Sequence, residues 1–353
     1  MLPRFPYSLP RFPPSPMISK TVKLSSSLFN NPPQKPTRQG YGEGLVEAGA
    51  ADESVVVLCT DLTESTRSNL FKEAYPKRFV QMGISEQAMA GIAAGMALTG
   101  KTPFISSYAA FSPGRNWEQI RTLIGLQNTN VKIGGAHAGI SVGPDGATHQ
   151  ALEDIATMRV IPNMTVLVPC DVHEARKATV AAALMTGPVY LRFARANSSV
   201  FTTTQTPFTI GKAEVYRDGT DVAIIAAGPI LYEALKAAEA LSKSGRVGSA
   251  FGGKRIEVRV INCHTIKPLD KKTILAAAKD CGAIVTCEEA QIIGGLGGAV
   301  AECLAEHHPT PIERIGMQDC YGESGEPAEL LEHFGLTAPH IVKAVQRVLR
   351  RKK

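Results

Sequence analysis

The sequence predicts an α/β protein built from two doubly wound domains. Short apolar runs recur along the chain from residue 54, and stretches with a helical pattern separate them. The runs are rich in β-branched residues and apolar on both faces, which is typical of parallel strands covered by helices on each side. Residues 196–220 break the pattern, which then resumes, so we expect two domains joined by a linker.

The first series of runs predicts six strands and three helices. The expected strands are 55–59, 78–82, 103–106, 131–135, 165–169 and 189–193, and the expected helices are 86–99, 114–127 and 173–185. This alternation predicts right-handed crossovers within a parallel sheet. Ligands bind such sheets beyond the carboxyl ends of the strands, so a site is expected in the segments that follow them.

The second series is shorter and predicts four strands. These are 221–228, 257–263, 283–289 and 311–316, followed by a final helix near 340–350. We therefore expect a first domain over 37–205, a linker over 206–220 and a smaller domain over 221–353. The glycine-rich stretch 244–255 is interpreted as a loop insertion without chemistry of its own.

The composition of the 353 residues is that of a globular chain, with 44% hydrophobic and 20% charged residues. The net charge of +6 arises in residues 1–42, which hold six basic residues and no acid. The rest of the chain is neutral, so no nucleic-acid surface is expected. Seven cysteines without a CxxC pair predict free thiols in a reducing cytoplasm. No apolar run reaches the ~20 residues that span a bilayer, so no membrane segment is expected.

The first 36 residues are rich in proline and contain no acid, which predicts a disordered tail. A transit segment is the alternative, but the prolines oppose the amphipathic helix that such segments form. We favour a disordered tail, with Met17 as an alternative start of the protein.

A glutamate begins the helix expected at 86–99. Ala, Gly, Met and Ile make up nearly the whole helix, so we expect it to be buried, with Ser85 as its N-cap. One interpretation is that Glu86 only complements the positive end of the helix. A carboxylate beside a helix without a polar face requires a partner, however, and this favours a functional role.

Two aromatic residues follow the strand expected at 103–106. Side chains such as Tyr108 and Phe111 are more often plain core residues. Near Glu86 they can instead form a flat apolar wall for a planar ring. Which of the two makes the closer contact stays open.

The loop of residues 134–150 reads GGAHAGISVGPDGATHQ and lies between an expected strand and a helix. It contains His137, Asp145 and His149. Their spacing resembles that of metal ligands, but such ligands need a rigid geometry. The glycines of the loop favour a segment that wraps an organic substrate instead, and we expect no metal site in this chain.

These segments resemble the transketolase family of thiamine-diphosphate enzymes. Residues 82–100 are similar to its G-x-x-E-x-x-x-x-x-x-x-G stretch, and 134–150 are similar to its loop of the form THDSIGVGEDGPTHQ. The resemblance implies a pyrimidine-binding domain followed by a transketolase C-terminal domain. It also implies that Glu86 contacts N1′ of the aminopyrimidine and that Tyr108 and Phe111 stack on that ring.

The same resemblance implies further site residues. His137 would bind the sugar-phosphate end, Asp145 the α-hydroxyl of the acceptor, and His149 the donor portion attached to the cofactor. Glu86, His137 and His149 form the implied catalytic set. Arg38, Ser65 and Arg195 would bind the substrate phosphate, for which an arginine fork is well suited, and Asp61 would lie near the cofactor at a subunit boundary. Taken singly, each of these last four residues is more often a surface ion pair or a cap.

The resemblance covers residues 35–353 and leaves out the family's diphosphate-binding domain. In the family that domain holds Mg²⁺ through a G-D-G motif and an Asn, and this chain has no G-D-G. The resemblance therefore implies an N-terminal subunit on a separate chain, which binds Mg²⁺, and a heterotetramer of the two. Together they would transfer a two-carbon ketol unit between sugar phosphates such as xylulose 5-phosphate and ribose 5-phosphate, as in the pentose phosphate pathway.

Two kinds of alternative function stay open. One is a related enzyme, either a 1-deoxyxylulose-5-phosphate synthase or the beta subunit of a 2-oxo-acid dehydrogenase. The other is a non-catalytic scaffolding remnant. In the second domain, Glu288 and Glu289 precede the motif GGLGG, but neither a dinucleotide fingerprint nor a P-loop lysine is present, so a turn into a helix is the better interpretation.

Overall fold

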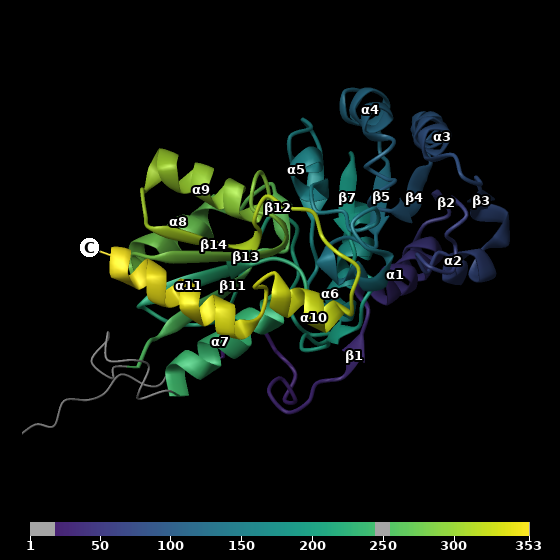
Figure 1. Cartoon of the computed structure of the whole chain (residues 1–353). Coiled ribbons are helices and arrows are strands. Elements are labelled where there is room, and N and C mark those ends of the chain that lie inside the picture. Colours follow the sequence, from purple (N-terminus) through teal and green to yellow (C-terminus); the bar gives the residue numbers. More distant parts are fainter. Residues whose placement is uncertain (1–17, 244–254, 353) are drawn as a thin grey trace, which may run out of the picture.

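The computed structural model describes residues 18–243 and 255–352, which fold into two α/β domains side by side (Figure 1). Each domain contains a mainly parallel sheet with helices on both faces. This confirms the predicted fold class. Except for Arg255, the loop predicted at 244–255 lies outside the described residues, as do the first 17 residues of the predicted tail.

The first domain is built on a seven-stranded sheet with the order β12-β6-β7-β5-β4-β2-β3. Its strands are β2 Val55–Cys59, β3 Phe79–Gln81, β4 Thr102–Tyr108, β5 Lys132–Ala136, β6 Thr165–Leu167, β7 Val189–Arg192 and β12 Thr265–Lys267. The first six are parallel and correspond to the six predicted strands. The seventh, β12, comes from the second half of the chain and pairs antiparallel with β6.

Helices cover both faces of this sheet. They are α1 Thr37–Ala51, α2 Asn69–Ala74, α3 Glu86–Leu98, α4 Trp117–Gln119, α5 Asp154–Arg159 and α6 Val172–Leu184, with 3-10 helices at Pro76–Arg78 and Ile140–Asp145 and a π-helix at Ile120–Gly125. Successive residues of β2 face opposite ways: Val57 packs with α1 and α6, whereas Leu58 packs with α3 and the π-helix. Burial of both faces explains why the strands are apolar throughout.

The second domain contains a five-stranded sheet with the order β14-β13-β10-β11-β9. Its strands are β9 Glu214–Arg217, β10 Val222–Ala226, β11 Val258–Asn262, β13 Ile284–Gln291 and β14 Ile312–Met317, and its helices are α7 Leu231–Lys243, α8 Lys271–Cys281, α9 Leu296–His307, α10 Pro327–His333 and α11 Ala338–Arg351. Helices α7 and α11 lie on one face, and α8 and α9 on the other (Figure 1). The core beneath α8 and α9 is continuous with that beneath α3, so the domains share apolar packing.

Two predictions about chain connections need correction. Residues 18–36 are not disordered, because Val22 and Leu28 are buried in the core of the second domain and β1 (Gln34–Lys35) pairs with β8 (Ser198–Ser199). Apolar burial and backbone pairing offset the entropy of ordering this segment, whose prolines suggested the opposite. The linker predicted at 206–220 contains β9, which pairs antiparallel with β11.

Two predicted helices also differ in detail. Helix α3 forms where expected, but the prediction that it is buried is wrong for this single chain, since Ile92 is 44% and Leu98 71% exposed. The helix buries only the face that packs on the sheet. The helix predicted at 114–127 is mostly a π-helix, preceded by the single turn of α4.

All seven cysteines are free thiols, and Cys320 is the exposed one among them. Across residues 18–243 and 255–352, none of the helices has the length and apolar character needed to cross a membrane.

Candidate functional site

The carboxyl ends of β2, β4, β5 and β7 meet at one edge of the first sheet, as parallel strands must. Tyr108 is the last residue of β4, and the segments that follow β2, β5 and β7 contain Ser65, His137 and Arg195. The amino ends of α1 and α3 reach the same edge and bring Arg38 and Glu86. The topology therefore gathers residues that are far apart in the sequence.

Glu86 is buried at the first turn of α3, with 2% of its surface exposed. Its Oε1 accepts a hydrogen bond from Ser107 Oγ at 3.1 Å, and Asn116 Nδ2 donates to its backbone carbonyl at 3.1 Å. Within the described residues the carboxylate has no ion pair. Ser85 occupies the N-cap position as predicted, but its hydroxyl donates to the Met82 carbonyl at 2.6 Å and does not cap the helix. The Glu86 carboxylate is thus fixed in place with acceptor capacity remaining.

Aromatic and imidazole rings lie close to Glu86. The first of them belongs to Tyr108, the residue after Ser107 in the sequence. The rings of Tyr108 and His137 stack with centroids 3.7 Å apart, and those of Tyr108 and Phe111 are nearly parallel at 6.0 Å. His149 lies edge-on to Phe111 at 5.5 Å and to Tyr108 at 6.2 Å. One face of Tyr108 is therefore covered by His137.

His137 is buried and has a left-handed backbone with φ of 53°. Burial is the main cause that lowers its pKa to about 3, and the charges of Arg38, Arg195 and His149 act in the same direction. The imidazole is therefore neutral near pH 7. Its Nε2 lies 3.4 Å from Arg38 Nη1, which can only donate, so Nε2 accepts and the proton belongs on Nδ1. Nδ1 is buried without a partner among the described residues.

Three arginines, Arg38, Arg67 and Arg195, lie together beside this histidine and Ser65, with Arg38 between the other two and the closest to His137. Arg38 Nη1 donates to the Ser65 carbonyl at 2.7 Å, and Arg195 Nη1 donates to the Val142 carbonyl at 3.2 Å. Burial is the main cause that lowers the pKa of Arg38, and the charges of Arg67 and Arg195 lower it further. None of the three forms an ion pair with a carboxylate in the described part of the chain. The positive charge at this edge is therefore uncompensated.

No sequence pattern predicted a role for Arg67. Its backbone is left-handed, with φ of 65°, and its Nε is buried without a partner among the residues described. A Cβ on Gly42 would lie 2.8 Å from the Arg67 Cβ, so the glycine lets this loop approach α1 closely. Gly42 is one helical turn after Arg38, and this pair in the motif TRQGYG was the only local signal that something packs there.

Two of the predicted site residues have no hydrogen-bonded or ionic side-chain partner in this cluster. Asp61 and Asp145 are exposed, and neither side chain has a hydrogen bond or an ion pair within the described residues. His149 Nδ1 is 2.9 Å from the hydroxyl of Thr148. The structure thus brings together Arg38, Ser65, Tyr108, Phe111, His137, His149 and Arg195, with Glu86 beside them. Within the described ranges no group of three or more His, Cys, Asp or Glu side chains is placed to hold a metal.

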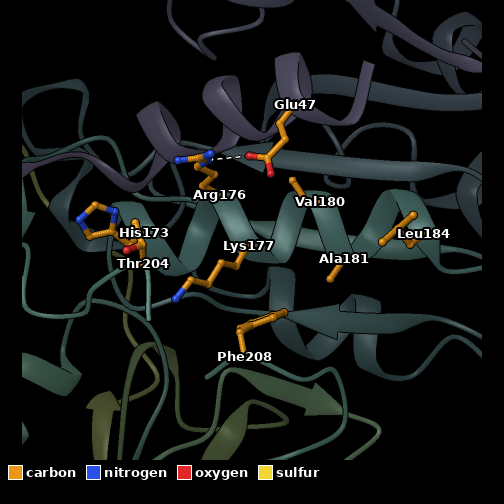
Figure 2. A pocket seen from close by; sticks show the side chains of 9 residues that line it. All are labelled: Glu47, His173, Arg176, Lys177, Val180, Ala181, Leu184, Thr204 and Phe208. Carbon is orange, nitrogen blue, oxygen red and sulfur yellow. Dashed lines mark hydrogen bonds and ion pairs between the residues drawn. The ribbon is translucent and has the colours of Figure 1, made fainter. Parts of the chain in front are cut away.

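A separate cavity of about 330 Å³ lies on the outer side of α6, between α1 and residues 204–208 (Figure 2). Figure 2 shows Arg176 turned toward Glu47, and their ion pair measures 2.7 Å from Nε to Oε2. Lys177 points the other way and donates to the Thr203 carbonyl at 2.7 Å. Arg176 and Lys177, which line this cavity, thus already have partners. None of the predicted site residues lines the cavity, so we place the candidate site at the sheet edge.

Comparison with known proteins agrees with this division of the chain. The family model of the transketolase pyrimidine binding domain matches residues 34–199, and that of the transketolase C-terminal domain matches residues 211–341. The chain belongs to the transketolase family. Membership of this family implies dependence on thiamine diphosphate.

Several transketolase relatives share the length of this chain. It is 42% identical to a protein named as a transketolase C-terminal section in Methanocaldococcus jannaschii, over 90% of this chain and 97% of that one. It is 40% identical to a 6-deoxy-6-sulfo-D-fructose transketolase subunit of Clostridium sp. strain MSTE9, over 89% and 95%. A split-gene transketolase solved as an inactive beta4 tetramer superposes with a TM-score of 0.81 at 43% identity, over 90% of this chain and 99% of that one. By contrast, the chain covers 51% of the transketolase-like protein 2 of Mus musculus.

Proposed function

We propose that the chain is the C-terminal subunit of a thiamine-diphosphate-dependent transketolase and acts in the cytoplasm with an N-terminal subunit. One observation carries the proposal. A buried carboxylate with acceptor capacity and a group of uncompensated arginines lie beside one neutral histidine, at the edge where α/β sheets bind ligands. Residues of this kind suit a cofactor at one end of the site and an anionic substrate at the other.

The surroundings of Glu86 support its role toward the cofactor. Bound thiamine diphosphate would supply the electron sink for ketol transfer. Glu86 would hold a proton at N1′ of the aminopyrimidine, for which a buried carboxylate fixed by Ser107 is well suited. Tyr108 and Phe111 would form the apolar wall for the ring. Because His137 covers one face of Tyr108, we favour Phe111 as the closer contact.

The arginines support binding of the substrate phosphate. Guanidinium groups placed together without carboxylates repel one another, and a dianion between them relieves that repulsion. Arg38 and Arg195 would bind the phosphate with the hydroxyl of Ser65, and Arg67 would add a third guanidinium. Neutral His137 would donate from Nδ1 without adding to the positive charge.

Asp145, His149 and Asp61 would contact the substrate and the partner chain. Asp145 would accept a hydrogen bond from the α-hydroxyl of the acceptor aldose, and His149 would contact the donor portion. Asp61 would lie near the cofactor at the subunit boundary. The partner chain would bind Mg²⁺ and the diphosphate through its G-D-G motif.

The assembly would be a heterotetramer of two chains of each kind. It would transfer a ketol unit from xylulose 5-phosphate to ribose 5-phosphate, a reaction of the pentose phosphate pathway. Relatives named for other sugars, such as apulose 4-phosphate in Phocaeicola vulgatus, show that the family admits several substrates. The beta4 tetramer described as inactive supports the need for a partner.

Reconstitution tests this proposal. The purified chain alone should show no ketol transfer, because this sequence lacks the G-D-G motif. Addition of an N-terminal subunit with that motif, thiamine diphosphate and Mg²⁺ should produce transfer between xylulose 5-phosphate and ribose 5-phosphate. Robust activity of the chain by itself, or decarboxylation of pyruvate faster than ketol transfer by the pair, would overturn the assignment.

A further inference from the structure

Two adjacent buried glutamates of β13 have different partners. Glu288 stays within the second domain, where its carboxylate accepts from Leu296 N at 2.7 Å and Gly297 N at 2.8 Å, at the start of α9. Glu289 faces the other side of the strand, as alternation requires, and reaches the first domain. There its Oε1 accepts a hydrogen bond from Ser141 N at 2.7 Å.

Ser141 lies in the loop that contains His137, Asp145 and His149. Just before it, Gly139 has φ of +91°, and a Cβ there would lie 2.4 Å from Glu289 Oε1. The loop can therefore pass directly over the carboxylate only because this residue is a glycine. The contact is between a buried charged acceptor and a backbone donor, which is among the stronger kinds of hydrogen bond.

The buried charge of Glu289 has a counterpart in the first domain. Arg192, at the end of β7, donates from Nη2 to the Glu289 carbonyl at 2.8 Å and forms a buried ion pair with Asp154 at 2.8 Å. Its charge lowers the pKa of the Glu289 carboxyl, which burial raises more strongly. The carboxylate is therefore anchored at the junction of the domains and cannot turn toward solvent.

The same loop touches the second domain at three further points. Gln150 Nε2 donates to the Glu323 carbonyl at 2.8 Å. A Cβ on Gly146 would lie 2.5 Å from Ser324 Oγ, and one on Gly143 would lie 3.1 Å from Pro327 Cγ. From Gly139 to Gln150 the loop thus rests on residues of the second domain.

We propose that Glu289 is a positioning residue, through which the second domain fixes the loop that carries His137, Asp145 and His149. It touches no reacting group and acts only through Ser141 N and the path of the backbone. The inference rests on the proposed function in so far as this loop contacts substrate. It gives the second domain, which contributes no residue to the candidate site, a role in shaping that site.

Residue-resolved hydrogen–deuterium exchange on the full chain tests the contact without any assay of activity. Glu289→Ala should speed exchange of the Ser141 amide by about 10- to 100-fold, the range for loss of one charge-assisted hydrogen bond. Glu289→Gln should restore most of the protection, since its amide oxygen can accept. Glu288→Ala is the matched control and should speed exchange at Leu296 and Gly297 while leaving Ser141 protected.

Kinetics on the reconstituted enzyme then test the consequence. Glu289→Ala should lower kcat for ketol transfer, with kcat restored in Glu289→Gln, because misplacing the loop affects the reacting geometry. Equal Ser141 exchange in wild type and Glu289→Ala, or equal acceleration by Glu288→Ala, would overturn the inference. If the wild-type pair transfers no ketol unit, the proposed function fails, whereas the exchange comparison still decides for or against Glu289.

Discussion

Buried and half-buried charges in the two domains have different surroundings. In the second domain the Glu288 carboxylate accepts hydrogen bonds from two backbone N–H groups. The Asp270 carboxylate likewise accepts from the N–H of Thr273, at the start of α8, and from that of Ala213, just before β9. At the sheet edge of the first domain Glu86 accepts from a single hydroxyl, and Arg38 and Arg195 donate to carbonyl groups without a carboxylate nearby. Charge that is removed from water without a partner of opposite sign costs stability, so a group of three such arginines beside Glu86 indicates a surface shaped for ligands.

The sharpest test of this contrast is the pair Glu86→Gln and Glu288→Gln. The first removes the charge proposed to hold a proton at the cofactor, so turnover of the reconstituted enzyme should fall by at least ~10²-fold. Its melting temperature should change little, because Glu86 has one side-chain partner. Glu288→Gln should do the reverse, with altered stability and near-normal turnover. Equal turnover in both variants would contradict a functional role for Glu86 that Glu288 does not share.

A second test addresses the arginines. Arg195→Ala should raise KM for sugar phosphates roughly 10- to 100-fold, the value of one charge-assisted hydrogen bond, and should barely affect hydroxypyruvate, which has no phosphate. Arg176→Ala is a matched control, since that arginine pairs with Glu47 away from the site. Initial rates with both donors give the comparison. The same loss on both donors would mean that Arg195 supports the fold or an interface instead.

Asp145 gives a smaller expected effect. Asp145→Ala should penalise ribose 5-phosphate about tenfold relative to its 2-deoxy analogue, because only the former can lose a hydrogen bond to the carboxylate. Because Asp145 is exposed, its replacement should leave the fold intact, and thermal unfolding of the variant checks this. Equal rates of transfer by the wild-type enzyme to ribose 5-phosphate and to its 2-deoxy analogue would show that Asp145 does not recognise the acceptor hydroxyl.

The smallest effect concerns pH. Burial raises the pKa of Glu288 from 4.5 to about 7. The folded chain therefore holds this proton more tightly than the unfolded chain. The contribution of the protonated Glu288 carboxyl to the free energy of unfolding is full below about pH 4.5 and is lost as the pH rises toward 7. Glu288→Gln cannot titrate and should flatten the fall in unfolding free energy between pH 5 and 7 by at most about 1.4 kcal/mol per pH unit. Denaturant titrations at three pH values measure this, and parallel curves would contradict it.

The sequence was informative where local pattern and packing agree. The runs around 55–59, 131–135 and 189–193 are apolar on both faces because helices cover both faces of their sheet, and all three form strands. The segments that follow strands also met at one edge, since parallel topology leaves no other arrangement. The contacts of Asp61 and Asp145 could not be predicted in this way, because exposed side chains need a substrate or partner to define their neighbours.

Other features depend on contacts that no local pattern contains. Strand β12 is three residues long and forms only because β6 offers an open edge. Arg67 is distant in sequence from Arg38 and lies beside it only after α1 and the loop pack through Gly42. The apolar surface of α3 predicted burial, yet a single chain covers one face of the helix alone.

The position of β12 has a consequence for the order in which the protein can be completed during synthesis. Residues 165–167, which form β6, leave the ribosome well before residues 265–267, which form its neighbouring strand β12. Until then the first sheet ends in an unpaired strand with open N–H and C=O groups, the kind of edge that invites pairing with a neighbouring chain. A nascent chain halted between these two segments should therefore be prone to aggregation, and release of the second half closes that edge.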